Sequence, residues 1–252
     1  MNHTAQARPV AFVTGASYGI GAATALALAD AGYRLVVADL NEGMLSETLA
    51  ALATRSDGHV GVALDVTRQD SVTRVVAQAV DQLGQLDVLV NNAGVPLRKD
   101  AVDVTREDWG RTIGVNLEGT FFMSQAVGLH LIQAKRPGAI VSVASTHGLM
   151  GVPTSSTYGI AKAGISHMTR MLAIEWAPFG IRVNAIAPAS TVTPTRKNLN
   201  DPDKREAFAA RIPLGRLGAP QDMADAIAFL AGPRASFITG QVLAVDGGLT
   251  AA

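Results

Sequence analysis

Cysteine is absent from the 252 residues of this chain, and positive and negative side chains occur in equal numbers. The absence of cysteine excludes disulfide bonds, thiolate nucleophiles and zinc sites with sulfur ligands. It is also typical of a protein in a reducing compartment. Lys and Arg together number 21, as do Asp and Glu, so no overall field attracts nucleic acid or an anionic membrane.

Long uninterrupted hydrophobic runs are also absent. The apolar-rich stretch 20–38 is broken by Asp30, Gly32 and Arg34, which predicts a helix followed by a strand rather than a membrane span. Residues 1–8 are polar and lack the apolar core of a signal peptide, so we expect an N-terminal tail on a cytoplasmic protein. No histidines and carboxylates stand at the spacing of metal ligands, so we expect no catalytic metal.

Short β-branched runs alternate with longer amphipathic segments. The predicted strands are Val10–Thr14, Leu35–Ala38, His59–Leu64, Leu86–Asn91, Ala139–Val143, Ile181–Ala187 and Gln241–Val245. Several are apolar almost throughout, as expected for strands buried on both faces of a parallel sheet. Thr67–Asp70 and Thr105–Asp108 have the sequence of capping boxes and predict the starts of two helices. Gly84 is expected to end the first of these helices.

This alternation predicts β-α-β crossovers and a doubly wound, mostly parallel sheet of the α/β class. No linker, repeat or change of composition divides residues 1–252, so we expect a single domain. Residues 189–217 are rich in Pro, Asn, Lys and Arg and are too long for an ordinary connection. We interpret them as a mobile lid or substrate loop; a surface excursion with one short helix near Lys204–Arg211 is the alternative.

A glycine-rich turn follows the first predicted strand directly. It reads Gly15-Ala16-Ser17-Tyr18-Gly19-Ile20-Gly21 and leads into a segment with helical spacing. Glycines allow the backbone to turn tightly and approach a pyrophosphate, whose charge the helix N-terminus favours. Glycines also mark plain tight turns, but the strand before and the helix after supply the context of a dinucleotide site.

An acidic residue stands at the end of the second predicted strand. Asp39 lies 18 residues beyond Gly21, where a carboxylate can accept hydrogen bonds from both ribose hydroxyls of an adenosine and repel a 2′-phosphate. Leu40 follows it where a basic residue could hold that phosphate, and the glycine turn has no Arg or Lys. We therefore expect NAD rather than NADP; an N-cap role for Asp39 is the alternative.

The third and fourth predicted strands also end in polar or small residues. Asp65-Val66 could face an adenine, and Asn92-Ala93-Gly94 could let a cofactor lie against the backbone. Both segments could equally be turns. Their position favours binding, because open α/β sheets bind ligands at the carboxyl ends of their strands.

Tyr158 and Lys162 are four residues apart in a predicted helix, so their side chains share one face. A phenol with a pKa of about 10 is a poor base near neutrality. A neighbouring ammonium, and the positive charge of an oxidised nicotinamide, would lower that pKa. Tyr158 could then take a proton from an alcohol or return it to a ketone.

Two further polar residues could complete this site. Ser145 follows the fifth predicted strand and could hydrogen-bond the reacting oxygen. Asn116 is flanked by apolar residues, and it is either a satisfied buried amide or an anchor for water on a proton path to Lys162.

Together these motifs resemble those of the short-chain dehydrogenase/reductase family. The resemblance spans the chain and rests on Thr14-Gly15-x-x-x-Gly19-x-Gly21, Asn91-Asn92-Ala93-Gly94, Asn116, Ser145 and Tyr158-x-x-x-Lys162. It extends to Arg182-Val183-Asn184, Pro213-Leu214-Gly215-Arg216, Ile238-Thr239-Gly240-Gln241 and Asp246-Gly247-Gly248.

The resemblance implies a Rossmann fold with strand order 3-2-1-4-5-6-7 and, commonly, a homotetramer. It implies that Tyr158 is the acid/base, that Ser145 orients the substrate oxygen and that Asn116 supports a water relay. By the same likeness, Lys162 binds the nicotinamide ribose and depresses the tyrosine pKa.

One segment departs from the family pattern. After the sixth strand the run is Pro188-Ala189-Ser190-Thr191-Val192-Thr193, with Ala189 in place of glycine and Thr191 in place of an aliphatic residue. Alanine fits there if φ is negative and is strained if φ is positive. Nicotinamide contacts by Pro188, Thr191 and Thr193 follow from the resemblance.

Candidate substrate residues follow the strand ends above the nicotinamide position: Arg98, His147, Met150 and Val152. His147 could bind a hydroxyl or carboxylate, which favours a polyol, sugar-derived or hydroxy-acid substrate; a surface histidine is the alternative. Arg98-Lys99 and Arg196-Lys197 keep open a 3-oxoacyl-thioester reductase acting on a phosphopantetheine carrier. A non-catalytic NADH sensor is a third hypothesis, but a sensor has no use for the Tyr158–Lys162 pair.

Overall fold

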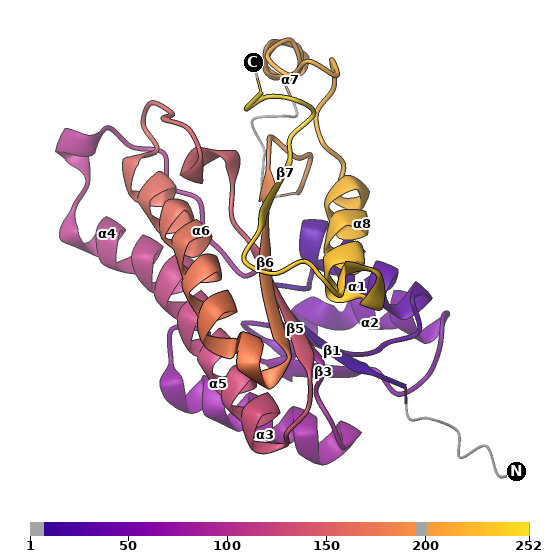
Figure 1. The fold of residues 1–252 in the computed structure, drawn as a ribbon. Helices are drawn as coiled ribbons and strands as arrows, with labels where there is room; N and C mark the ends of the chain where they lie inside the picture. Colours follow the sequence, from indigo (N-terminus) through magenta and orange to yellow (C-terminus); the bar gives the residue numbers. More distant parts are fainter. Residues whose placement is uncertain (1–7, 195–200, 252) are drawn as a thin grey trace, which may run out of the picture.

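The computed structural model describes residues 8–194 and 201–251, which include a seven-stranded parallel sheet in the predicted order β3-β2-β1-β4-β5-β6-β7 (Figure 1). All six neighbouring pairs are parallel. The strands are β1 Val10–Thr14, β2 Arg34–Asp39, β3 Val60–Ala63, β4 Val88–Asn91, β5 Gly138–Val143, β6 Ile181–Pro188 and β7 Val242–Val245. The predicted strands are confirmed with shifts of one or two residues at their ends.

Helices cover both faces of this sheet. They are α1 Gly19–Asp30, α2 Ser46–Ala53, α3 Gln69–Leu83, α4 Arg106–Ile113, α5 Gly119–Gln133, α6 Ser156–Trp176, α7 Pro202–Ala209 and α8 Pro220–Ala231. Buried side chains of α3, α5 and α6 form one core against the sheet, and those of α1, α2 and α8 form the other. Figure 1 shows these two groups on opposite sides of the strands.

Strand β1 illustrates why the strands are apolar throughout. Val10 and Phe12 belong to the core under α3 and α5, whereas Ala11 and Val13 belong to the core under α1 and α8. Successive side chains of a strand point to opposite faces, so a strand covered on both sides needs apolar residues at every position.

The two predicted capping boxes have different outcomes. Thr105 and Asp108 cap α4 reciprocally, as predicted. The prediction at Thr67 is wrong, because α3 begins at Gln69 and has no side-chain cap. The Thr67 backbone N–H and hydroxyl donate to Asp65 Oδ1 instead, at 2.9 and 2.7 Å, so this carboxylate competes for the groups that a capping box would use. Gly84 ends α3 in the left-handed conformation, as predicted.

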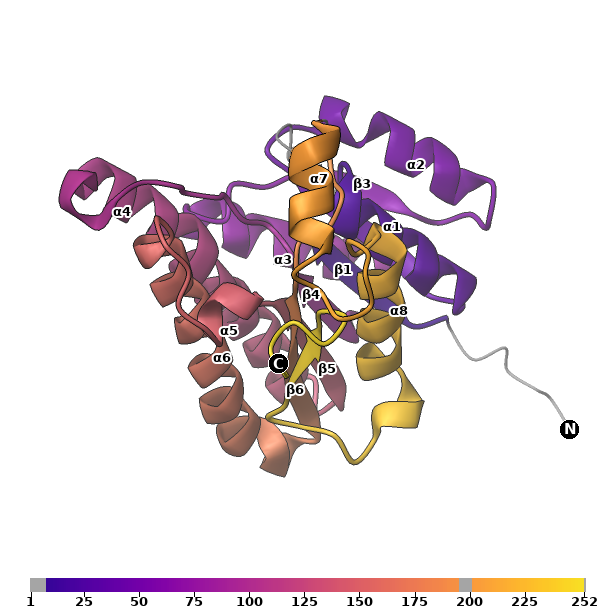
Figure 2. The ribbon, with the colours of Figure 1, turned by 90° about the horizontal axis from the view of Figure 1, so that it is seen from above.

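The segment 189–217 lies over the carboxyl ends of the strands, as far as the structure describes it. Its short helix α7 runs from Pro202 to Ala209 and lies over that edge of the sheet, near the C-terminal residues (Figure 2). Ala189, Ile212 and Leu217 form a small separate core there. Arg196 and Lys197 are outside the described residues.

No helix in the described ranges is long and apolar enough to span a membrane.

Candidate active site

The carboxyl ends of β1 to β5 open into a cleft of about 840 Å³. Residues from the glycine turn, from each following strand end and from α6 line it together. The predicted site residues in its lining are Gly15, Tyr18, Gly19, Ile20, Asp39, Leu40, Asp65, Val66, Asn92, Ala93, Gly94, Arg98, Asn116, His147, Tyr158, Lys162 and Thr193. Ser17, Gly21, Met150, Val152, Ser145, Pro188 and Thr191 lie outside this lining.

The glycine turn has no room for side chains on its inner side. Gly15 has a φ of +63° and a Cβ on it would lie 2.9 Å from the Ala93 backbone. A Cβ on Gly21 would collide with the Gly15 carbonyl oxygen. The turn therefore packs tightly against the end of β4, and α1 begins at Gly19 with its first residues at the cleft.

Asp39 is fixed by the same turn. Its Oδ2 accepts hydrogen bonds from the Ser17 backbone N–H at 3.2 Å and from the Ser17 hydroxyl at 2.5 Å. Its Oδ1 accepts from the Leu40 N–H at 2.9 Å. The Asp39 carboxylate is partly exposed to the cleft. Ser17 does not line the cleft itself, but its two hydrogen bonds orient this carboxylate.

Asn92 joins the fourth strand end to the glycine turn. Its side-chain amide donates to the Gly15 carbonyl at 2.7 Å and the Thr14 carbonyl at 3.1 Å. The backbone N–H groups of Asn92 and Ala93 both lie 3.0 Å from the Thr14 hydroxyl and donate to it. These bonds hold the ends of β1 and β4 at the point where the strand order reverses, which is where such sheets bind nucleotides.

Lys162 and Tyr158 lie one turn apart on α6, as the spacing predicts. The Lys162 nitrogen lies 5.6 Å from the centre of the Tyr158 ring and donates to the Val143 carbonyl at 2.7 Å. Lys162 is only 4 % exposed, and this burial lowers its pKa from 10.5 to about 8. The ammonium is therefore close enough to stabilise a phenolate in the cleft.

Asn116 is fully buried in a π-helical turn between α4 and α5. Its amide nitrogen donates to the carbonyls of Val95 and Thr112, each at 2.9 Å. Its Oδ1 has no hydrogen-bond partner within the described ranges. A Cβ on Gly94 would lie 2.7 Å from this oxygen and 3.6 Å from the Lys162 nitrogen, so the three residues meet. A buried acceptor of this kind is costly unless a water or ligand donates to it.

Ser145 lies just beyond β5, buried beside the cleft rather than in its lining. Its hydroxyl oxygen accepts from the His147 N–H at 3.2 Å. The His147 ring packs edge-on against Tyr158, with centroids 5.7 Å apart, and its Nδ1 shares a 2.8 Å hydrogen bond with the Ser155 hydroxyl. His147 is therefore part of the site rather than a solvated loop residue.

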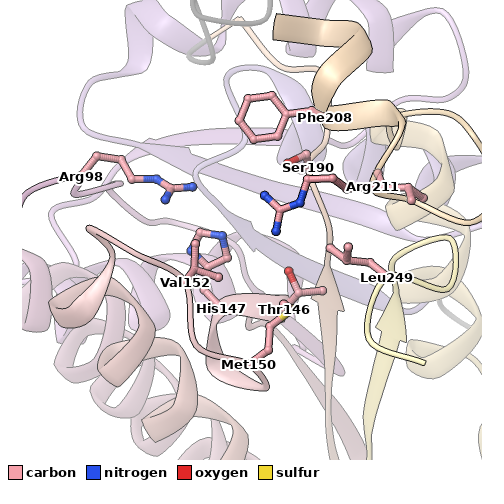
Figure 3. A pocket seen from close by; sticks show the side chains of 10 residues that line it. Arg98, Thr146, His147, Met150, Val152, Ser190, Phe208, Arg211 and Leu249 are labelled. Carbon is pink, nitrogen blue, oxygen red and sulfur yellow. The ribbon is translucent and has the colours of Figure 1, made fainter. Parts of the chain in front are cut away.

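A smaller pocket of about 40 Å³ adjoins the cleft, because Arg98 and His147 line both (Figure 3). It brings together the four predicted substrate residues, Arg98, His147, Met150 and Val152. Sequence reasoning did not identify Phe208 and Arg211, which also line it. The only sequence signal for them was their place in the irregular segment 189–217.

The residues at and after the end of β6 differ in whether they line the cleft. Thr193 lines the cleft, and a Cβ on Gly19 would lie 3.2 Å from its methyl group. Thr191 is buried and donates to the Ala189 carbonyl at 3.1 Å, and Pro188 pairs with Val245 at the end of β6. Ala189 does not have a positive φ, so alanine is unstrained where the family usually has glycine.

These observations fit a nicotinamide dinucleotide. The glycine turn would approach the pyrophosphate, Asp39 would receive the adenosine ribose, and the partnerless Asn116 Oδ1 faces Lys162 where the nicotinamide ribose would lie. Within residues 8–194 and 201–251, no three His, Asp or Glu side chains gather as a metal site.

Comparison with known proteins supports the same assignment. A family model described as enoyl-(acyl carrier protein) reductase matches residues 15–250. The chain is 44% identical over 248 residues to cis-4-hydroxycyclohexanecarboxylate dehydrogenase of Sinomonas cyclohexanicum, covering 97% of this chain and 98% of the relative. It is 41% identical over 245 residues to 3-oxoacyl-[acyl-carrier-protein] reductase of Thermotoga maritima, covering 95% and 97%.

Solved structures agree with this result. A short-chain type dehydrogenase/reductase from Mycobacterium marinum superposes with a TM-score of 0.93 at 32% identity, covering 97% of this chain and 96% of that one. The motifs of the cleft, the strand order and these relatives together lead to one conclusion. The chain belongs to the short-chain dehydrogenase/reductase family of oxidoreductases.

Proposed function

We propose that this protein is an NAD(H)-dependent dehydrogenase of a small secondary alcohol, either a polyol, a sugar derivative or a hydroxy acid. The observation that carries the proposal is the meeting of Tyr158, Lys162 and Asn116 in one cleft that ends at Asp39. When bound there, oxidised nicotinamide accepts a hydride from the carbon of the alcohol and the reduced form returns it to a ketone.

The side chains divide the proton chemistry between them. The Lys162 ammonium, 5.6 Å from the centre of the ring, stabilises Tyr158 as a phenolate. This phenolate takes the hydroxyl proton as the hydride leaves and becomes a neutral phenol. Ser145 holds the reacting oxygen in place. Asn116 uses its partnerless Oδ1 to hold a water that connects Lys162 with solvent.

Asp39 supports NAD as the cofactor. Its carboxylate is fixed beside the glycine turn by Ser17, and Leu40 next to it is 66% exposed and uncharged. The basic residues in the described lining are Arg98 after β4, Arg111 on α4 and Lys162 on α6, and none of them belongs to the glycine turn or to the end of β2. A 2′-phosphate would meet the negative charge of Asp39, and neither the glycine turn nor Leu40 supplies a cation to offset it. NADP is the alternative, since the related ElxO, 31% identical with a TM-score of 0.92, has NADP bound.

The nearest alternative activity is reduction of a 3-oxoacyl thioester. The Thermotoga maritima relative has this activity in its name, and Arg98 in the cleft lining could pair with the phosphate of a phosphopantetheine carrier. The Sinomonas cyclohexanicum, Azotobacter vinelandii and Escherichia coli relatives are instead named as dehydrogenases of a hydroxycyclohexanecarboxylate, of L-rhamnose and of a 2-dehydro-3-deoxygluconate. A sensor without turnover is a weaker alternative, because all four catalytic positions are retained.

We also propose a cytoplasmic homotetramer. Large apolar side chains are exposed on α5, α6 and the β7 edge, where a second copy would cover them: Phe122, Leu129, Ile160, Met171, Ile174 and Leu243. Light scattering of the purified protein after gel filtration tests the proposal, and a monomer would contradict it.

The function is tested by two parallel assays. Oxidation of a panel of polyols, sugars and hydroxy acids is followed with NAD and with NADP, and reduction of an acetoacetyl thioester is followed with NADH and NADPH. We expect turnover of the panel with NAD. A protein that reduces only the thioester would support the alternative activity, and one that binds NADH without any turnover would support the sensor.

A further inference from the structure

The pocket beside the cleft contains two arginines that the catalytic mechanism does not use. Arg98 belongs to the loop after β4, and Arg211 follows α7. Figure 3 shows their guanidinium groups pointing into the pocket from opposite sides, with the His147 ring below them. Residues far apart in the sequence therefore direct two positive charges at one small volume.

Neither arginine has a carboxylate partner among the described residues. Seven ion pairs form there, and none includes Arg98 or Arg211. The Arg98 side chain donates to the Pro153 carbonyl at 3.2 Å, which leaves most of its donors for a ligand. Two cations that face one another repel, and an anion between them would relieve that repulsion. A planar guanidinium also matches a carboxylate in geometry, because both groups present two parallel hydrogen-bonding positions.

The remaining lining of the pocket combines the polar residues Thr146, His147 and Ser190 with apolar side chains. Met150, Val152 and Phe208 surround the two guanidinium groups, and Leu249 closes the pocket from the C-terminal segment (Figure 3). The volume of about 40 Å³ would hold on the order of three waters. This space suits a carboxylate with a few carbon atoms better than a phosphate on a long carrier arm.

The pocket is also correctly placed for the reaction. His147 lines both the pocket and the cleft, lies two residues after Ser145, and packs against the Tyr158 ring. A molecule anchored between the arginines would therefore extend past His147 toward Ser145 and Tyr158. The anion is held at one end of the molecule, and the hydroxyl reacts at the other.

We propose that the substrate is a hydroxy acid whose carboxylate is bound between Arg98 and Arg211, with an aliphatic or alicyclic body that extends past His147 into the cleft. This proposal rests on the proposed dehydrogenase function and narrows its substrate class. The carboxylate takes no part in the redox chemistry. It fixes the distance and orientation of the hydroxyl relative to Tyr158, so its loss affects both binding and positioning.

The test compares acids with neutral molecules of the same shape. The values of kcat/KM are measured for 4-hydroxycyclohexanecarboxylate and 3-hydroxybutyrate and for the corresponding carboxamides. Charge-assisted hydrogen bonds predict that each acid is preferred over its amide by roughly ten- to hundredfold. Arg98→Gln and Arg211→Gln should each remove most of this preference by lowering kcat/KM for the acids and leaving the amides within about twofold.

Arg205→Gln is the matched control for charge. Arg205 is an exposed residue of α7 outside the pocket, so its replacement removes the same charge from the helix that precedes Arg211. It should leave the ratio of acid to amide unchanged. Equal kcat/KM values for acid and amide in the wild type, or equal losses for both in Arg211→Gln, would overturn the proposal.

Binding without turnover separates this proposal from the proposed function. Cyclohexanecarboxylate and cyclohexanecarboxamide are titrated calorimetrically into the protein saturated with NADH. Binding of the acid alone, lost in Arg211→Gln, supports the carboxylate site even if no alcohol is oxidised. Failure of the acid to bind overturns the site. Loss of acetoacetyl-carrier reduction in Arg211→Gln, with no acid binding in the wild type, would assign the arginines to a carrier phosphate instead.

Discussion

The Lys162 nitrogen lies 5.6 Å from the centre of the Tyr158 ring and is held in a buried position by the Val143 carbonyl. The two side chains both line the cleft but differ in exposure, since Tyr158 is half-buried and Lys162 is buried. This arrangement gives the phenol a cation on its protein side and leaves its other side for substrate. Each member can therefore be tested separately.

Replacing Tyr158 by phenylalanine should remove turnover without removing cofactor binding. The variant lacks the hydroxyl that exchanges the proton, and such a loss lowers kcat by roughly 10²- to 10⁴-fold or more. The ring remains to pack against His147. Steady-state kinetics and NADH fluorescence titration measure the two effects. Substantial residual activity would show that another group is the acid/base.

Replacing Lys162 by methionine should change how stability depends on pH. The buried ammonium has a pKa of about 8 in the folded protein, against 10.5 for an exposed lysine. Between these values the unfolded chain binds more protons, so the Lys162 contribution to the free energy of unfolding rises with pH. The wild type should gain roughly 2–3 kcal/mol relative to the variant between pH 7 and pH 10.

Urea unfolding at several pH values measures this difference. Comparing the two proteins at each pH cancels the titration of all other groups and the lost hydrogen bond to Val143, which shifts the difference by a constant. A difference that does not change with pH would show that Lys162 keeps an ordinary pKa in the folded protein. The variant should also lose turnover, because the phenolate loses its cation.

Replacing Gly21 by alanine should damage the cofactor site through the backbone. The new Cβ would collide with the Gly15 carbonyl oxygen and the Asn92 amide, and neither strand end can retreat without breaking the bonds between β1 and β4. Overpacking of this kind costs roughly 1–3 kcal/mol of stability. We expect the Kd of NADH to rise at least about tenfold, because the turn must open.

Gly43→Ala is the control for this change. Gly43 is exposed beside α2, and a Cβ there would meet only the Asn41 side chain at 3.4 Å. Thermal unfolding and NADH titration of the two variants separate the close packing of the turn from a general effect of replacing glycine. An unchanged Kd of NADH in Gly21→Ala would show that the turn can accommodate a Cβ at this position, contrary to the structure.

The residues that could be placed from sequence are those whose position follows from local rules. The strand Val10–Thr14, the glycine turn and Asp39 follow from apolar runs and strand ends, because a parallel sheet brings all its carboxyl ends to one edge. The side chains of Tyr158 and Lys162 could be placed side by side from helical spacing alone. The capping box at Thr67 was mispredicted because the carboxylate of Asp65, two residues away, accepts the Thr67 N–H and hydroxyl.

The position of Arg211 in the pocket could not be predicted from local sequence patterns. No periodicity or spacing connects it with Arg98, and the two approach only because α7 lies over the carboxyl ends of the strands. Ser17 is a second example. Its place in the glycine turn was evident, but its bond to Asp39 depends on the alignment of β1 with β2, which the sequence does not display.

Replacing Asp39 by asparagine should change the choice between NADH and NADPH. Asparagine keeps an acceptor for Ser17 and for a ribose hydroxyl, so the change removes mainly the negative charge. At a separation of a few ångströms, the repulsion of a phosphate is worth about 1–4 kcal/mol. The ratio of the Kd for NADPH to that for NADH should therefore fall at least about tenfold. Asp225→Asn on α8, outside the cleft, should leave that ratio unchanged. A wild type that binds NADPH more tightly would contradict the role of Asp39, since a carboxylate held by Ser17 cannot turn away from the phosphate without losing both hydrogen bonds.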